Sequence, residues 1–403
     1  MEIKVYRNWN IKKAKDLYTY CSGISKGAKY FGTGFPYLTF TEIFHNYFVP
    51  DTLTNFVQSN DRERKNCSIK RGDVFLTRTS ETDNELGMSC VALKDYPNAT
   101  FNGFSKRLRP INNEILPEYA GFYFRSPIFR AAVTSMSSII TRASLNEKML
   151  DRLPVVLPPL SVQQKIANIL SRYDEAIENN SKRIKLLEQM AQNLYKEWFV
   201  RFRFPGYEKC EFENGMPKGW CYKKLFDVVN VTYGYAFASE LFCDDETLNP
   251  VVRIRDILDN QTNTFTSETC ADKYIIKENE ILIGMDGIFH MCMWNGEKAY
   301  QNQRVVKLTS KTNEISNYFL FLAVQPQVKF LEQTIAGTTV AHLGDKHLKR
   351  MSILLPSESV LNDATKIFDS LMKQKNQLFK LNQNLANQRD LLLPRLMSGK
   401  LEV

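Results

Sequence analysis

The sequence predicts an α+β protein in which one unit, a mixed α/β globular domain followed by a long helix, occurs twice in tandem. Residues 102–158 align without a gap with residues 300–356, and this shift of 198 residues continues into the helices that follow. Residues 9–23 also match residues 220–234, at a shift of 211. A repeat of about 200 residues is too long for a solenoid, so we expect a duplicated domain and a pseudo-twofold molecule.

The first globular domain, residues 1–157, is predicted to contain a sheet with a helical cover. Residues 37–40, 73–77 and 152–157 are short runs of apolar, β-branched and aromatic residues, a composition typical of strands. Residues 116–133 carry apolar side chains at helical spacing. We expect that helix to cover one face of the sheet.

A long helix is predicted next, over residues 158–204. Pro158 and Pro159 precede Ser161, and Gln164 follows three residues later, which is the arrangement of a capping box at a helix N-terminus. Apolar side chains then recur at spacings of four and three, as in the seam of a coiled coil. The seam residues are Ile166, Leu170, Tyr173, Ile177, Ile184, Leu187 and Leu194.

The second globular domain, residues 205–356, repeats the pattern of the first. Residues 251–254, 280–283 and 351–355 correspond to the three predicted strands, and residues 315–331 to the predicted helix. The first domain has 16 more residues between its first predicted strand and the aligned tail. The two copies have therefore diverged in their loops, where binding specificity usually resides.

The second long helix is predicted over residues 357–403, with a leucine at every seventh position of its seam. The seam residues are Phe368, Leu371, Leu378, Leu385 and Leu392. If this helix folds back along the first, the two form an antiparallel coiled coil, and about 40 helical residues span about 60 Å. The pair is then a spacer between two globular domains. The alternative is two ordinary amphipathic helices that cover separate cores.

Polar residues interrupt both seams. Asn180 in the first helix, and Lys375, Asn382 and Arg389 in the second, occupy positions where an apolar residue is expected. Such residues either fix the register of a helix pair at a cost in stability or face another subunit.

The chain carries a net charge of +9, which is distributed unevenly. Residues 1–155, 156–204, 205–355 and 356–403 carry +7, +3, −3 and +2, respectively. A basic balance favours a polyanionic partner, but the slightly acidic second domain needs local basic patches to bind one.

The composition favours a cytoplasmic protein. No apolar run has membrane-spanning length, and the first five residues lack the apolar core of a signal peptide. The eight cysteines include no Cys-x-x-Cys pair, which favours reduced thiols. The four histidines are too scattered to predict a zinc site.

Two motifs resemble parts of catalytic sites. Residues 31–34 (Phe-Gly-Thr-Gly) resemble the glycine loop of a methyltransferase, but no helix follows them, so we interpret them as a turn before a strand. Asp51 with residues 63–65 resembles a nuclease metal site, but its loop has no strand pattern and the second domain lacks the arrangement. We expect no catalytic residue, metal or cofactor in this chain.

The remaining signal is one of binding, because polar and basic loops recur at equivalent places in the two domains. Arg, Lys, Asn, Gln, Ser and Thr side chains reach the phosphates and base edges of DNA, and plain solvated loops are the alternative. The candidate contacts of the first domain are Thr77, Arg78, Thr79, Ser80, Lys106, Arg107, Thr141 and Arg142. Those of the second domain are Asp286, His290, Asn302, Gln303, Arg304, Thr338, Thr339 and His342.

Several specific strings of the chain resemble the specificity subunit of a Type I restriction-modification system. These strings are residues 157–166, 198–208, 216–220 and 391–401. The resemblance covers the whole length, and the alternation of domain and helix is the same as in that family. One departure is Ser-Glu-Ser-Val-Leu at residues 357–361, where the family pattern has a second Pro-Leu-x-x-Gln-Gln.

The resemblance implies two target-recognition domains, each of which reads one half of a bipartite double-stranded DNA site. It implies that the helices set the gap between the halves and dock two methyltransferase (modification) subunits, which the restriction subunits join in the complex. Adenine methylation and DNA cleavage, with S-adenosylmethionine, Mg²⁺ and ATP, belong to those partner chains. Two alternatives stay open: a self-contained DNA methyltransferase or nuclease, and a structural coiled-coil adaptor.

Overall fold

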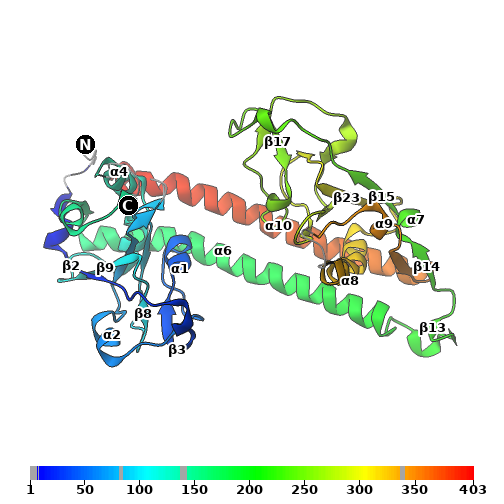
Figure 1. The fold of residues 1–403 in the computed structure, drawn as a ribbon, viewed down its shortest axis with the longest axis horizontal. Coiled ribbons are helices and arrows are strands. Elements are labelled where there is room, and N and C mark those ends of the chain that lie inside the picture. The colour runs from blue at the N-terminus through cyan, green and yellow to red at the C-terminus, as the bar shows by residue number, and fades with distance from the viewer. Residues whose placement is uncertain (1–6, 8, 81–84, 137–142, 336–340) are drawn as a thin grey trace. The chain divides into compact units, whose positions relative to one another are not determined.

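The fold is described for residues 7, 9–80, 85–136, 143–335 and 341–403 of a computed structural model (Figure 1). Two globular parts built on sheets and two long helices are present, as the sequence predicts. Among these residues, no helix combines the length and the apolar content that a membrane span requires.

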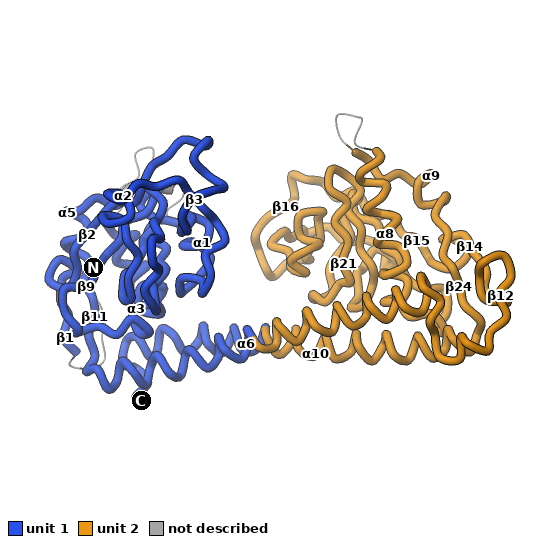
Figure 2. The backbone as a smooth tube through the Cα atoms, turned by 90° about the horizontal axis from the view of Figure 1, so that it is seen from below, with its two compact units in different colours: residues 1–178, 383–403 blue, residues 179–382 orange. Residues whose placement is uncertain are grey.

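The chain divides into two compact units (Figure 2). Unit 1 consists of residues 1–178 and 383–403, and unit 2 consists of residues 179–382. Each unit combines a globular head with a segment of both long helices, because the division crosses each helix along its length. We call residues 7–157 of unit 1 head 1, and residues 205–356 of unit 2 head 2.

Head 1 is built on an antiparallel four-stranded sheet with the order β2-β9-β5-β7. These strands are β2 (Tyr18–Ser22), β9 (Ser105–Pro110), β5 (Val74–Thr77) and β7 (Ser89–Val91). A three-stranded sheet contains β4 (Phe56–Val57), β3 (Phe31–Leu38) and β8 (Thr100–Phe101). The strand predicted at residues 37–40 is the end of β3, and the one predicted at residues 73–77 is β5.

The strand β5 separates two apolar cores in head 1. Val74 and Leu76 lie in one cluster of buried residues, and Phe75 lies in the other. Neighbouring side chains of a strand point to opposite faces of the sheet, so β5 is buried on both faces. This explains why its sequence is a continuous apolar run and not an alternation of apolar and polar residues.

Head 2 repeats this plan with the sheet order β15-β23-β20-β21. These strands are β15 (Val229–Tyr233), β23 (Val305–Ser310), β20 (Ile281–Gly284) and β21 (Met291–Met293). Ile281 and Ile283 lie in one apolar cluster and Leu282 lies in a second, as in β5 of head 1. The second sheet contains β16 (Phe242–Cys243), β18 (Phe265–Thr266), β17 (Asn249–Val252), β22 (Ala299–Gln301) and β19 (Ile275–Ile276).

The structural repeat differs by two residues from the predicted alignment at the start of the aligned tail. The strand β9 begins at Ser105 and β23 begins at Val305, which is a shift of 200 and not of 198. The shift of 198 holds for the last strands, β11 (Pro154–Leu157) and β24 (Ser352–Leu355). The two additional residues of head 1 therefore lie between β9 and β11.

The helical cover also differs between the two heads. The helix predicted over residues 116–133 is two helices, α3 (Pro117–Tyr123) and α4 (Pro127–Met136), whereas head 2 has the single helix α8 (Asn317–Ile335). Pro127 is the first residue of α4, where a proline is tolerated, whereas Pro326 lies inside α8, so a proline at this place does not by itself divide the cover.

The first long helix, α6 (Leu160–Tyr195), starts differently from the prediction. Ser161 lies inside its first turn, so the predicted capping box does not form. The buried Gln163 fixes the start instead. Its side-chain oxygen accepts from the Leu116 amide at 2.9 Å, and its side-chain nitrogen donates at 2.9 Å to two carbonyl oxygens, one of them that of Pro158. A single buried amide thus ties the helix to head 1.

Each core includes helix residues from the other half of the chain. In unit 1, Leu393 and Leu396 of the second long helix, α10 (Glu358–Met397), join Ile166 of α6 and the apolar residues of head 1. In unit 2, Ala191 of α6 lies in the same buried cluster as Phe368 of α10. Neither half of the sequence therefore contains a complete core.

The two helix segments of unit 2 run antiparallel. Lys375 forms an ion pair with Glu188 at 2.9 Å, and the Asn180 side-chain amide donates to the side-chain oxygen of Asn382 at 2.9 Å. Residue numbers thus fall along α6 as they rise along α10. The antiparallel pairing is confirmed in this unit, and the polar seam residues pair with one another.

The same direction holds in unit 1, where the Arg389 guanidinium binds the Asp174 carboxylate at 2.6 Å. The predicted seam residues lie along these lines of contact. Those that are buried are Ile166, Leu170, Phe368, Leu371 and Leu378. Those that are half-buried are Tyr173, Ile177, Ile184, Leu187, Leu194, Leu385 and Leu392.

We predict that Gly23→Ala destabilises unit 1, because a Cβ at this position would lie 2.1 Å from the carbonyl oxygen of Asn102. Overpacking of this kind costs about 1–3 kcal/mol of unfolding free energy. The control is Gly27→Ala, since a Cβ on Gly27 meets nothing within 4 Å. Urea unfolding of both variants is the measurement, and equal midpoints would contradict the prediction.

Candidate nucleic-acid interface

Three segments that lie close together in head 1 contain or adjoin the residues predicted to bind DNA. They are residues 77–80, the turn before residues 106–107, and the residues that follow 141–142. The Arg78 amide donates to the Phe104 carbonyl at 3.0 Å, and the Arg78 carbonyl accepts from the Leu145 amide at 2.8 Å. The strand β6 (Thr79–Ser80) pairs with β10 (Ala143–Ser144). Thr141 and Arg142, the candidates of the third loop, lie outside the described residues.

Head 2 has the same backbone framework with different side chains. The Met285 amide donates to the Arg304 carbonyl at 3.0 Å, and the Met285 carbonyl accepts from the Leu343 amide at 2.8 Å. Asp286 then forms a bridge with His342. The loops predicted from the sequence therefore come together in both heads. Thr338 and Thr339 lie outside the described residues.

Three predicted residues of head 2 form one charged cluster. The Asp286 carboxylate lies 2.6 Å from Nδ1 of His342 and 3.4 Å from Nε of Arg304. The side chains of His342 and Arg304 are 48% and 55% exposed, whereas that of Asp286 is 28% exposed. The acidic residue thus holds two exposed groups that can donate hydrogen bonds at neighbouring positions on the surface.

A groove of about 510 Å³ lies beside this cluster in head 2. Four predicted residues line it: His290, Asn302, Gln303 and Arg304. Its other lining residues are Phe237, Ser239, Phe242, Arg253, Ile254 and Arg255. Three arginines line this groove, although head 2 as a whole is slightly acidic, and two of them have acidic partners: Arg304 lies 3.4 Å from Asp286 and Arg255 lies 3.6 Å from Asp256.

The residues predicted to bind DNA do not include Arg253, which fell inside the strand predicted over residues 251–254, or Arg255, which follows that strand. The strand β17 ends at Val252, and Arg253 then lies with its guanidinium 5.5 Å from the centre of the Phe242 ring. The alternation Arg-Ile-Arg directly after an apolar run was the available signal. It places two cations at the end of a strand, where loops and ligands meet.

Asn302 shapes the turn that presents its neighbours. It is 9% exposed, and its backbone amide donates to the carbonyl oxygen of Val252 at 3.2 Å. Asn102 has the same place in head 1, where its side-chain oxygen accepts from the Phe104 amide at 3.0 Å. The exposed residues at the tip are Gln303 and Arg304 in head 2, against Phe104 in head 1, where the neighbouring Gly103 is buried.

Three predicted contacts of head 1 face the interior. Thr77 is fully buried, and its hydroxyl donates to the Glu85 carbonyl at 2.7 Å and accepts from the Met88 amide at 2.9 Å. Lys106 is 8% exposed and pairs with Glu147 at 2.8 Å. We leave these residues, and Arg107, out of the proposed contact set.

Arg107 is 7% exposed and donates to the carbonyl oxygens of Ser68 and Asn66 at 2.6 and 3.1 Å. Its charge acts on a pair of thiols beneath the sheet. A hydrogen bond from Cys67 lowers the pKa of the Cys21 thiol to about 6, and the positive charge of Arg107 adds to the lowering. The burial of the two basic residues of β9 was not predicted, because both faces of this strand are covered, so alternation cannot identify an outward side.

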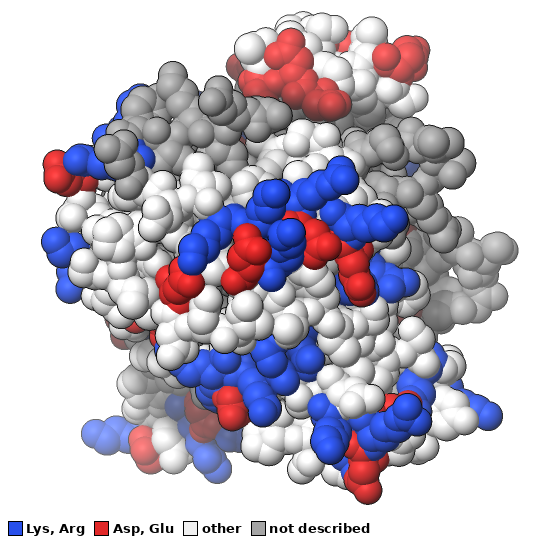
Figure 3. Space-filling model, turned by 90° about the vertical axis from the view of Figure 1, so that its left-hand side faces the viewer, with Lys and Arg blue, Asp and Glu red and all other residues white. Residues whose placement is uncertain are grey.

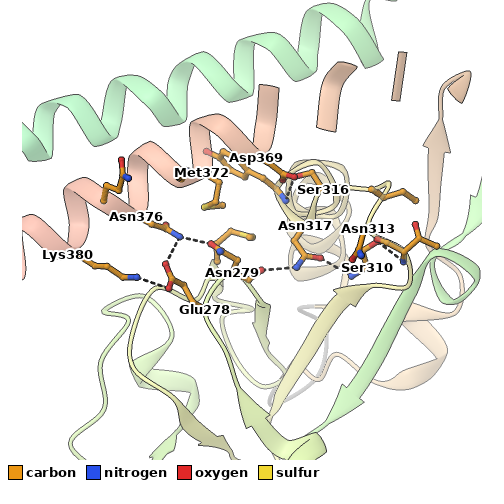
Figure 4. Close-up of a pocket in the computed structure, with 16 residues that line it drawn as sticks. Glu278, Asn279, Ser310, Asn313, Ser316, Asn317, Asp369, Met372, Asn376 and Lys380 are labelled. Atoms are coloured by element: carbon orange, nitrogen blue, oxygen red, sulfur yellow. Dashed lines mark hydrogen bonds and ion pairs between the residues drawn. The ribbon is translucent and has the colours of Figure 1, made fainter. Parts of the chain in front are cut away.

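A second polar cavity, of about 530 Å³, lies where α10 meets head 2 (Figure 4). Asn376 is 5% exposed, and its amide nitrogen donates to Glu278 at 2.9 Å and to Asn279 at 2.6 Å. Lys380 binds the other oxygen of Glu278 at 2.7 Å. These contacts fasten the helix to the loop before β20.

Charged groups of both signs share the surface drawn in Figure 3. Lys and Arg groups stand there beside Asp and Glu groups and do not form an uninterrupted basic area. Within the described ranges, no group of three or more His, Cys, Asp or Glu side chains is placed to hold a metal ion.

Comparison with known proteins points to one family. The family model described as "Type I restriction modification DNA specificity domain" matches residues 6–189 and 217–388. The MjaIX specificity subunit of a Type I restriction enzyme from Methanocaldococcus jannaschii is 26% identical over 99% of this chain and 95% of that protein. The HindI specificity subunit from Haemophilus influenzae is 22% identical over 89% of this chain and 93% of that protein.

A solved structure shares the fold. It is the S subunit of a Type I restriction-modification system from M. genitalium, with a TM-score of 0.55, 15% identity and 98% coverage of both chains. The domain repeat and the two long helices thus recur at low sequence identity.

We predict that Arg107→Met lowers the unfolding free energy of unit 1 by roughly 1.5–3 kcal/mol, because buried carbonyl oxygens lose a charged donor. It also raises the pKa of Cys21, since a positive charge that favours the thiolate is removed. Urea unfolding and the pH dependence of thiol alkylation measure the two effects. The control is Arg152→Met, at an exposed position of the same unit. Equal stability of the two variants would show that Arg107 does not serve the fold.

Proposed function

Because this chain belongs to the family of Type I restriction-modification DNA specificity proteins, we propose that each of its two heads reads one half of a bipartite DNA site. The chain is the recognition subunit of the complex. Adenine methylation and DNA cleavage are carried by modification and restriction subunits, which bring their own cofactors.

The observation that carries this proposal is the shared framework with different side chains. The hydrogen bonds around Arg78 in head 1 and around Met285 in head 2 have the same pattern. The exposed tips differ, with Phe104 in one head and Gln303-Arg304 in the other. A constant backbone with variable tips suits two heads that dock alike and read different bases.

The chemistry of the head 2 groove fits DNA. An arginine fork matches the two acceptors of guanine or the oxygens of a phosphate, and a glutamine amide matches adenine. We assign Arg304 and Gln303 to base edges, and Arg253 and Arg255 to phosphates. The proposed DNA contacts of head 2 also include His290 and His342. The proposed DNA contacts of head 1 are Arg78, Thr79 and Ser80.

The helices are proposed to set the gap between the half-sites and to dock two modification subunits. Leu186 and Met190 of α6 support the docking. Each is 57% exposed, and they lie one helical turn apart, outside the seam. Exposed apolar pairs of this kind mark surfaces that another protein covers.

The two motifs that favoured a catalytic chain have structural roles. Glu63 forms a capping box with Asn60 and an ion pair with Lys26 at 2.8 Å. Residues 31–34 are an irregular part of β3 and not a turn before it, and a Cβ on Gly34 would lie 2.5 Å from a backbone oxygen. Neither motif assembles a catalytic group among the described residues.

We predict that Arg304→Met weakens recognition of one half-site only. The loss of a bidentate base contact costs about 1–3 kcal/mol, and the substitution should relax specificity at one base pair. Methylation mapping of the host genome gives the site, and binding by the assembled complex is then measured on sites altered in each half. The control is Lys223→Met, on the exposed strand β14 (Cys221–Lys224). Damage to both halves, or to neither, would contradict the assignment.

We also predict that removal of one heptad from each helix shortens the preferred gap. Residues 177–183 and 380–386 face each other by the register of the seam, so their joint removal keeps the remaining pairs in phase. Seven residues rise about 10 Å, which is about three base pairs. Binding to a series of sites with varied gaps is the measurement. A folded deletion protein that keeps the original gap would show that the partner subunits set the spacing.

A further inference from the structure

Three polar pairs cross from α6 to α10, and one member of each is largely shielded from water, whereas the carboxylates of Asp174 and Glu188 are 29% and 40% exposed. The side chains of Arg389 and Lys375 are only 16% and 12% exposed, and Asn180 is 7% exposed. Buried polar groups of this kind are costly unless they are paired. Such pairs can serve the chain by specifying which helices associate.

The shift of 198 residues relates every position of α6 to one of α10. Met372 is the counterpart of Asp174, and Ala191 is the counterpart of Arg389. Asp174 and Arg389 form an ion pair in unit 1, whereas Ala191 and Met372 are buried in one apolar cluster in unit 2. The pseudo-twofold thus exchanges a charged pair for an apolar one.

The second pair behaves in the same way. Leu378 is the counterpart of Asn180, and Ile184 is the counterpart of Asn382. The two asparagines are hydrogen-bonded at 2.9 Å, and Asn382 also donates to the Ser181 hydroxyl at 3.2 Å. The seam therefore has an amide pair at one place and two branched aliphatic residues at the symmetric place.

The third pair is Glu188 with Lys375, at 2.9 Å. Their counterparts are Ala386 and Ile177, both half-buried. All three polar pairs thus have apolar partners across the pseudo-twofold. Both helices share the apolar positions of the seam, whereas each of these polar positions of one helix is apolar in the other.

This asymmetry decides which helices fit each other. Two copies of α6 in the same register would bring polar residues against apolar ones, in the pairs Asp174–Ala191, Asn180–Ile184 and Glu188–Ile177. Two copies of α10 would form the pairs Arg389–Met372, Asn382–Leu378 and Lys375–Ala386. Each mismatch would occur twice in a symmetric pair and would leave an amide or a partly buried charge without its partner.

We propose that the seam is a recognition surface that accepts only the helix of the other half of the chain. The polar pairs select α6 with α10 and reject α6 with α6 and α10 with α10. The half that carries head 1 therefore binds the half that carries head 2 and not a second copy of itself. This inference concerns helix pairing alone, so it holds or fails independently of what the heads bind.

The heads reinforce this choice through the two cations. The Arg389 guanidinium lies 5.2 Å from the centre of the Tyr47 ring in unit 1, and Lys375 Nζ lies 5.7 Å from that of Tyr318 in unit 2. Each cation therefore contacts an aromatic ring of its own unit as well as a carboxylate of α6. The α6 counterparts, Ala191 and Ile177, cannot make either contact.

The test starts from the full chain with a protease site inserted at Gly215. This residue lies in the turn between β12 (Phe212–Glu213) and β13 (Met216–Pro217), and nothing lies within 4 Å of a Cβ built on it. Exposed turns of this kind tolerate insertion and cleavage. Cleavage of the folded protein gives an N-piece with α6 and a C-piece with α10, which stay associated.

Two cleaved populations with different tags on both pieces are mixed, and urea is raised until the C-pieces have exchanged between them. Capture of one N-piece should then recover C-pieces of both tags and no N-piece of the other tag. Recovery of the second N-piece would overturn the proposal.

A symmetrised chain tests the cause. It carries the pseudo-twofold counterpart at each polar position: Asp174→Met, Arg389→Ala, Asn180→Leu, Asn382→Ile, Glu188→Ala and Lys375→Ile. We expect this chain, in the same exchange, to yield pairs of N-pieces as well as mixed pairs. If it still forms mixed pairs only, the polar residues are not what selects the partner.

A further test exchanges the two charges of one ion pair and leaves the rest of the seam unchanged. Asp174→Arg or Arg389→Asp alone should speed dissociation of the two pieces at least about tenfold, because like charges then face each other. The double variant, which carries both substitutions, should recover most of this loss. Its two opposite charges face each other only if α6 pairs with α10. The control is Arg172→Asp, an exposed position of the same segment. Failure of the double variant to recover would contradict the assigned pairing.

Discussion

The constraint on which this structure depends is that each head completes its core with a helix from the opposite half of the chain. Leu393 and Leu396 enter the core of unit 1, and Ala191 and Phe199 enter that of unit 2. A fully buried leucine contributes about 1.5–3 kcal/mol, so the loss of several such residues exceeds the margin by which a domain of this size is stable. The antiparallel helix pair is therefore part of both cores and not merely a connection between finished domains.

The scaffold was largely predictable from the sequence, because the repeat and the seam are periodic signals. The outward face of β9 was not. Lys106 and Arg107 look like surface residues, but both are buried among carbonyl and carboxylate oxygens supplied by residues far away in the sequence. Arg253 was missed for the opposite reason, since a strand was predicted to continue where it ends. Local patterns give the period of an element, whereas its limits and its covered faces come from distant residues.

The two heads also show how a binding surface can vary on a fixed support. Arg78 and Met285 have equivalent backbone hydrogen bonds, although one side chain is charged and the other apolar. Backbone hydrogen bonds do not depend on the side chain, so these positions can change without loss of the framework. An asparagine is present at the neighbouring turn in both heads, as Asn102 and Asn302, and both are buried. The Asn102 side-chain oxygen accepts from the backbone of its own turn.

Residues near the two ends of the chain lie together in unit 1. Arg7 donates to the carbonyl oxygen of Gly399 at 3.3 Å and pairs with Glu402 at 2.8 Å. The chain thus leaves unit 1 along α6 and returns to it along α10, and an exposed turn lies at Gly215 in unit 2. The fold therefore does not dictate which head is synthesised first. A circular permutant, joined at the present ends and opened at that turn, would contain the same helix pair and the same heads in reversed genetic order.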